Sequence, residues 1–188
     1  PSVSPPFSIP ANISAFLTDG LNGLDIGTGV ANVPTGTLIF DFGSIISPSQ
    51  IGDGIPDIIV SQIADPSAVQ DSVYFTDGAG NLVGNRLAIN HTTTASVGTW
   101  TADFYNANGT LSSGFTKTDR SLRVWAADIS AFGISAANYS PALSLRYKLN
   151  GSSDPAFLAF NSDIIQVVSA NHDIANTAIN VPAAINVL

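Results

Sequence analysis

Residues that suit the solvent-facing side of a helix are almost absent from this chain. All 14 of its acidic residues are aspartate, it contains no glutamate, and only two of its six basic residues are lysine. Glutamate and lysine have high helix propensity and usually fill solvated helix faces, whereas the abundant Thr, Val, Ile, Gly, Asn and Ser favour strands and turns. The composition therefore predicts an all-β protein.

Nine short segments rich in β-branched and aromatic residues follow one another along the chain, with turn signals between them. The signals include Asp77-Gly78 and Asn108-Gly109, pairs that supply the positive φ angles of tight hairpins. Such punctuation is typical of an antiparallel β-sandwich, and we expect a jelly-roll-like one with about nine strands. Residues 128–138 suit a short helical turn or a loop equally well. The expected strands span residues 37–46, 57–63, 72–76, 85–90, 97–105, 122–127, 143–149, 156–160 and 164–168.

The composition divides the chain into three parts. Residues 1–18 begin with four prolines among small polar residues, and we expect a linker or an extended edge strand there. Residues 19–170 contain every expected strand and form the β-sandwich domain. Residues 171–188 are expected to form a C-terminal strand or a linker to a following repeat.

The charge of the chain excludes several classes of partner. Its net charge is −8 at pH 7, and its six basic residues form no cluster along the sequence. Nucleic acids and anionic membranes bind through clustered lysine and arginine, so neither is expected as a partner. No uncharged apolar run approaches the ~18 residues that a membrane-spanning helix needs. The absence of cysteine excludes thiol catalysis, disulfides and thiolate metal sites.

One pair of aspartates suggests a metal site. Asp53 and Asp57 stand four residues apart around Gly54, as carboxylates do in some calcium loops. Calcium is therefore the cofactor that the sequence suggests, with Asp53 and Asp57 as ligands. The alternative is an Asp-Gly turn that leads into a strand, because the pattern lacks the third acidic position and the closing glutamate of an EF-hand.

No arrangement of residues in the sequence indicates catalysis. A Gly-x-Ser-x-Gly elbow is absent, and His91 and His172 each stand near a turn without a second histidine three or four residues away. We interpret both histidines as solvated loop residues. Because no candidate base has an identifiable partner, we expect that the chain is not an enzyme.

Aromatic residues give the remaining candidate site. Trp100, Tyr105 and Trp125 lie in the middle of the chain. Exposed rings beside hydrogen-bonding side chains make a platform for a carbohydrate ligand. Trp100 and Trp125 stand within expected strands, so packing in the core is the alternative. Exposure of these rings distinguishes the two interpretations.

Several stretches of the chain carry distinctive phrases. Among them are Gly-Asp-Gly-Ile-Pro-Asp at residues 52–57 and Trp-Thr-Ala-Asp-Phe-Tyr at residues 100–105. Together with residues 114–120 and 124–134, these phrases resemble a domain of large cell-surface proteins of Bacteroidota that are adhesin-like or gliding-associated. The resemblance covers about residues 37–162.

The end of the chain carries a second resemblance. Residues 173–188 are similar to the opening strand of cadherin-like or immunoglobulin-like repeats in bacterial adhesins. The two resemblances imply an extracellular domain at the cell surface, in an adhesive or structural protein or filament, whose partners are neighbouring domains or copies of the same protein. A lectin-like, carbohydrate-binding module of a secreted protein, with glycans as partners, is the alternative. Asp71-Ser72-Val73 also matches the short pattern that Bacteroidota glycosylate on oxygen, which implies Ser72 as a glycosylation site.

Overall fold

The structure is a computed structural model that describes residues 28–30, 33–63, 70–105, 118–151, 153–155 and 158–166. These residues form eleven strands: β1 (Thr28–Val30), β2 (Gly36–Asp41), β3 (Ser44–Ile45), β4 (Ile58–Ile63), β5 (Asp71–Thr76), β6 (Leu82–Ile89), β7 (Ser96–Tyr105), β8 (Thr118–Ala127), β9 (Ser144–Leu149), β10 (Leu158–Phe160) and β11 (Ile165–Gln166). They also form two short 3-10 helices, η2 (Pro48–Gln50) and η3 (Ile129–Phe132). Neither helix in the described part of the chain is long and apolar enough to cross a membrane.

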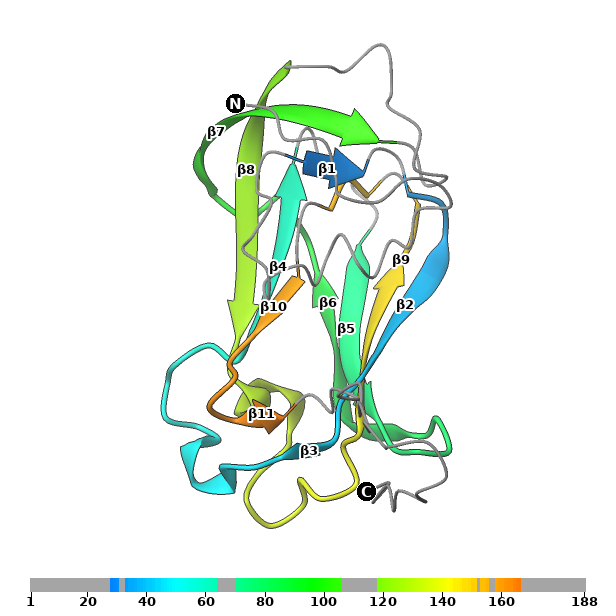
Figure 1. The fold of residues 1–188 in the computed structure, drawn as a ribbon, viewed down its shortest axis with the longest axis vertical. Coiled ribbons are helices and arrows are strands. Elements are labelled where there is room, and N and C mark those ends of the chain that lie inside the picture. Colours follow the sequence, from blue (N-terminus) through cyan, green and yellow to red (C-terminus); the bar gives the residue numbers. More distant parts are fainter. Residues whose placement is uncertain are drawn as a thin grey trace, which may run out of the picture.

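Two sheets face each other and enclose the core (Figure 1). One sheet has the strand order β1-β7-β8-β4-β10 and the other has the order β2-β9-β5-β6, while β3 and β11 form a small third sheet at the lower end. All strand pairs are antiparallel except that of β1 with β7. The expected all-β antiparallel sandwich is confirmed, with eleven described strands instead of about nine.

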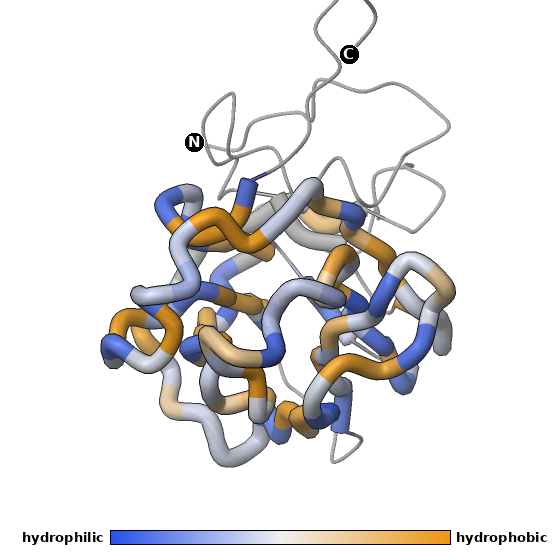
Figure 2. Tube along the Cα trace, turned by 90° about the horizontal axis from the view of Figure 1, so that it is seen from below, coloured by the Kyte–Doolittle hydropathy of each residue, from blue (hydrophilic) through white to orange (hydrophobic). Residues whose placement is uncertain are grey.

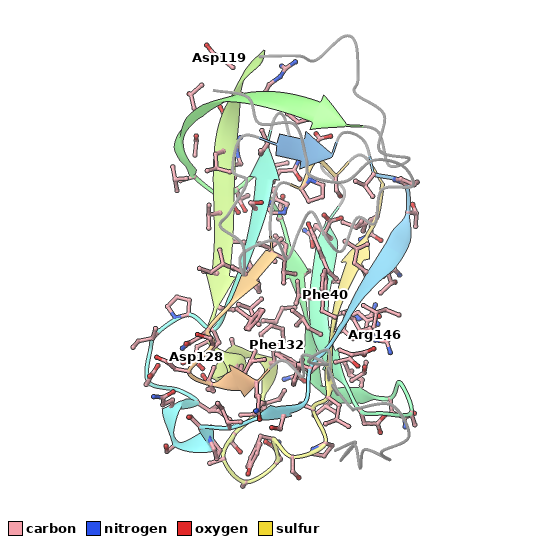
Figure 3. All side chains as sticks on the ribbon, viewed as in Figure 1. Phe40, Asp119, Asp128, Phe132 and Arg146 are labelled. Carbon is pink, nitrogen blue, oxygen red and sulfur yellow. The ribbon has the colours of Figure 1, made fainter. Side chains whose placement is uncertain are left out.

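The core fills the space between the two sheets. Along β9, Leu145 and Tyr147 are buried in this core. Arg146 and Lys148 alternate with them and are half-buried on the other face of the sheet, as the period of two in a strand requires. Figure 3 shows Phe132 between the sheets and Arg146 on the outer side of the four-stranded sheet.

Aromatic rings pack together in the core. The ring of Phe75 lies edge-on to those of Phe132 and Phe42, with centroids 4.9 Å and 5.9 Å apart. Trp125 packs edge-on against Phe132 at 6.5 Å. Such edge-to-face pairs add to the stabilisation that burial provides. Figure 2 views the molecule from below and shows apolar and polar segments alternating along the chain.

The 3-10 helix η3 lies at the lower end of the sandwich and packs against β6. Of the two alternatives for residues 128–138, the helical turn is thus found, with Ile129 and Phe132 buried. A Cβ on Gly84 of β6 would lie 2.1 Å from the carbonyl oxygen of Phe132, and the φ of Gly84 is +71°. Glycine is therefore required at this position, both for its backbone conformation and for the close approach of η3.

Strand boundaries differ from the expected ones where a bend or a distant strand decides them. The stretch 37–46 is interrupted by a bend at Gly43, so that β2 pairs with β9 while β3 pairs with β11. β8 begins earlier than expected, at Thr118, because β7 pairs with it up to that residue. The expected terminal segments 1–18 and 171–188 lie outside the described residues. The division of the chain into three parts therefore stays a prediction.

Candidate functional site

Asp128 holds the loop that contains the expected metal ligands (Figure 3). Its carboxylate accepts hydrogen bonds from the backbone amides of Gly52 (3.0 and 3.1 Å), Gly54 (3.2 Å) and Ser130 (2.7 Å). Burial opposes ionisation of Asp128, but the hydrogen bonds from Ser130 and the two glycines outweigh it and lower the pKa of this carboxyl. Asp128 therefore ties the loop between η2 and β4 to the start of η3.

Asp53 and Asp57 have different surroundings within this loop. Asp53 is exposed, and its Oδ1 accepts a hydrogen bond of 2.8 Å from the amide of Ile55, which makes an Asx turn. Asp57 is 1% exposed. Its two carboxylate oxygens accept from the amide of Ile129 (3.0 Å) and from Nδ2 of Asn161 (3.2 Å). Burial raises the pKa of the Asp57 carboxyl, although both of these hydrogen bonds act against the rise.

Hydrogen bonds within the protein thus engage both aspartates of the expected calcium loop. Asp53 makes the turn that the alternative interpretation expects, and Asp57 joins the start of β4 to η3 and to the loop between β10 and β11. Among the described residues, no group of three or more acidic or histidine side chains is placed to hold a metal ion. Calcium binding at Asp53 and Asp57 stays a prediction of the sequence.

Of the three aromatic residues expected at a ligand platform, the structure describes the side chain of Trp125 alone. Trp125 is half-buried, pairs with Val60 in the register of β8 and β4, and packs against Phe132. This is the core position that the alternative interpretation expects. Trp100 and Tyr105 belong to β7, and their side chains lie outside the described part, so a ligand-binding role for them stays a prediction.

Ser72, the expected glycosylation site, lies in the middle of the four-stranded sheet. It belongs to β5, with Ala88 of β6 on one side and Lys148 of β9 on the other. Only 7% of its surface is exposed. A glycan on its hydroxyl would require the side chains around it to move, so the folded domain disfavours modification at Ser72.

His91 is buried, which corrects the expectation of a solvated loop histidine. It is 5% exposed, and neither ring nitrogen has a hydrogen-bond partner among the described residues. Burial lowers the pKa of His91; the charge of Asp71 opposes this effect and that of Arg123 adds to it. The expectation failed because a position near a turn does not show which distant residues cover it. His172 lies outside the described residues.

Asp71 lies at the centre of a second group of buried hydrogen bonds. Its carboxylate accepts from the hydroxyl of Tyr147 (3.0 Å), the amide of Asn150 (2.9 Å) and the hydroxyl of Ser153 (2.9 and 2.7 Å). We call these four residues the Asp71 cluster. Burial, together with the charge and hydrogen bond of Asp71, raises the pKa of Tyr147 well above its usual value. Ser153 is buried and donates to a carboxylate, so it lacks the access that a nucleophile needs.

Acid is expected to destabilise the domain through His91. The unfolded chain protonates this histidine near pH 6.5, whereas burial lowers its pKa in the folded state. Below that pH the unfolded state therefore binds more protons, and stability falls as the pH falls. The urea concentration at the unfolding midpoint should therefore decrease when the pH is lowered from about 7.5 to about 5.5.

The His91→Gln variant cannot take up this proton and is the control. Its urea midpoint should fall less over the same pH range than that of the unchanged protein. Asp57, whose raised pKa has the opposite effect on the pH dependence, is common to both proteins and does not enter the difference. An equal fall in both proteins would contradict the role of His91.

The outer face of the four-stranded sheet carries three of the six basic residues of the chain. Arg86 belongs to β6, and Arg146 and Lys148 belong to β9. The guanidinium carbon of Arg86 lies 4.0 Å from the ring centroid of Tyr74 on β5, and Arg146 stands opposite Tyr74 in the register. We call these four residues the cationic face. Sequence reasoning did not find it, because its members are scattered along the chain.

Comparison with known proteins gives no match. No protein-family model, no curated protein and no solved structure matches the chain. The resemblance to surface proteins of Bacteroidota, and the roles that it implies, therefore stay predictions.

Proposed function

We propose that this domain is a non-enzymatic, extracellular module of a bacterial cell-surface protein or filament, with an adhesive or structural role. The β-sandwich supports the proposal, because this architecture is common in cell-surface domains. The resemblance of the sequence to adhesin-like proteins supports it as well. Its partners are neighbouring domains or copies of the same protein.

The observation that carries the proposal is that polar side chains that could perform catalysis are engaged in hydrogen bonds within the protein. Asp57, Asp71 and Asp128 each accept hydrogen bonds from backbone amides that lie far from them in the sequence. Ser153 donates its hydroxyl to Asp71. A general acid or a nucleophile needs access to its substrate, whereas these groups join distant parts of the chain.

A glycoside hydrolase is the enzyme that aspartates would most readily make, since two carboxylates suffice. Asp57 has the raised pKa of a general acid, because it is buried. However, it is 1% exposed and is bonded to Ile129 and Asn161. A substrate would have to displace these bonds to reach it, which weighs against catalysis at this position.

A carbohydrate-binding module of a secreted protein is the second candidate function. The cationic face favours it, because this face combines the ring of Tyr74 with three cationic side chains on the outside of a sheet. Exposed Ile39 and Leu82 lie at the edges of the same sheet. Polar groups beside apolar surface are what a sugar ligand requires.

The proposal predicts that the domain is retained on surfaces and does not hydrolyse polysaccharides. Beads coated with the purified domain should remain under flow on surfaces coated with polysaccharides or with the same domain, whereas uncoated beads should be washed away. Incubation with the same polysaccharides should release no reducing ends. Release that disappears in the Asp57→Asn variant would overturn the non-enzymatic role, and absence of retention on every surface would overturn the adhesive one.

A further inference from the structure

The cationic face differs in charge from the chain as a whole. The chain has a net charge of −8, yet Arg86, Arg146 and Lys148 share one sheet face. Within the described residues none of these three forms an ion pair. Asp41 and Asp77 lie on the same sheet and its hairpin, but the first accepts from Ser144 and the second from amides of its own turn. Among the described residues, the three cations therefore have no acidic partner.

Strand register arranges the cationic face in rows. One row crosses β6, β5, β9 and β2 and consists, in that order, of Arg86, Tyr74, Arg146 and Ile39. Neighbouring strands are about 4.8 Å apart, so the two arginines, which are separated by β5, are about 10 Å apart at their backbones. Lys148 follows on the same face of β9. The positive charges therefore lie close together on one accessible surface.

Neutral partners hold both arginines in place. Arg86 stacks on the ring of Tyr74, with 4.0 Å between its guanidinium carbon and the centroid. Among the described residues, Arg146 donates only from Nε, to Oγ1 of Thr76 at 3.1 Å, which leaves its two Nη groups for another acceptor. A guanidinium that is positioned but not neutralised can bind a carboxylate through two parallel hydrogen bonds and loses little freedom on binding.

We propose that the cationic face binds an oligosaccharide that carries carboxylates, such as one built from uronic acid sugars. The inference rests on the proposed function as a surface module and names a ligand for it. Arg86 and Arg146 bind the carboxylates, and Lys148 adds positive charge beside them. Ile39, which is 45% exposed at the end of the row, contacts the apolar C–H groups of a sugar ring.

Net charge selects this ligand over other anions. Nucleic acid carries a dense row of phosphates, which the aspartates over the rest of the molecule repel. A second copy of the chain, which is a partner in the proposed function, has the same net charge of −8, so we expect its contacts elsewhere than at the cationic face. A short oligosaccharide has few charges, and it fits within the cationic face while its neutral hydroxyl groups accept and donate hydrogen bonds. An acidic oligosaccharide is therefore the anion that this surface suits best.

Titration calorimetry of the whole chain with the galacturonic acid trimer tests the inference, with the neutral trisaccharide maltotriose as the comparison. We expect the acidic trimer to bind and to bind more weakly as salt is added, because exposed charges are screened. Maltotriose should bind at least about tenfold more weakly. The double variant Arg86→Gln with Arg146→Gln should weaken binding of the acidic trimer at least about tenfold.

Two further variants separate geometry from charge. Arg146→Lys keeps the charge but lacks the planar fork, so it should weaken binding, though less than Arg146→Gln. Arg120→Gln removes the same charge from β8 on the other sheet and should leave binding unchanged once thermal unfolding shows that it is folded. Equal binding of the two trisaccharides, or equal binding by the double variant and the unchanged protein, would overturn the inference. Retention of coated beads in that case would leave the proposed function standing.

Discussion

Replacement of Gly84 by alanine is expected to lower the free energy of unfolding by about 3–5 kcal/mol. Gly84 has a φ of +71°, which a residue with a side chain adopts at a cost. The new Cβ would also lie 2.1 Å from the carbonyl oxygen of Phe132 and 3.0 Å from Cγ1 of Ile134. Because the backbone carbonyl of Phe132 cannot rotate away as a side chain can, η3 would have to separate from β6. Urea unfolding followed by tryptophan fluorescence measures the loss.

Gly54→Ala is the matched control for this prediction. Gly54 also has a positive φ, of +86°, but no atom lies within 4 Å of a Cβ built there. Only the backbone strain remains, so the expected loss is about 1 kcal/mol. Equal losses for Gly54→Ala and Gly84→Ala would show that η3 does not pack against β6 as closely as the structure has it.

The fold class could be predicted because strands and hairpins leave local signals. The β-rich composition of residues 143–149 predicted a strand, and the structure gives β9 at Ser144–Leu149, where buried and half-buried residues alternate from Leu145 onward. At the Asp77-Gly78 signal, Asp77 accepts from the amide of Asn81 and closes the hairpin of β5 and β6. The partners of each strand were not predictable, since β5 also pairs with β9, and such pairing depends on packing across the whole sandwich.

The candidate site was less predictable because its hydrogen bonds join residues that are far apart in sequence. The spacing of Asp53 and Asp57 suggested a shared ion, but it did not indicate the hydrogen bonds that Asp57 accepts from Ile129 and Asn161. Asp128 did leave a usable signal, since an aspartate before a helical turn is a common N-cap, and it does accept from the amide two residues later. The cationic face left none, because only the register of three strands brings Arg86 and the basic residues of β9 together.

Replacement of Asp71 by alanine is expected to lower the free energy of unfolding by about 3–5 kcal/mol. The carboxylate is the common acceptor of the Asp71 cluster, and its removal leaves the hydroxyls of Tyr147 and Ser153 and the amide of Asn150 without this partner. Each buried donor that loses its acceptor costs about 1–3 kcal/mol. Asp163→Ala is the control, because Asp163 is exposed, and it should change stability by less than about 0.5 kcal/mol.

A double-mutant cycle with Tyr147→Phe separates the cluster from a general loss of packing. In the unchanged protein, Tyr147→Phe removes one donor while Asp71 keeps Asn150 and Ser153, and the expected cost is about 1 kcal/mol. In the Asp71→Ala background, the hydroxyl of Tyr147 has already lost its acceptor, and Tyr147 is 0% exposed. Removal of this hydroxyl by Tyr147→Phe should therefore cost no stability or restore some of it. Costs that simply add would mean that the hydroxyl and the carboxylate act independently, because coupling in such a cycle measures the interaction between the two groups.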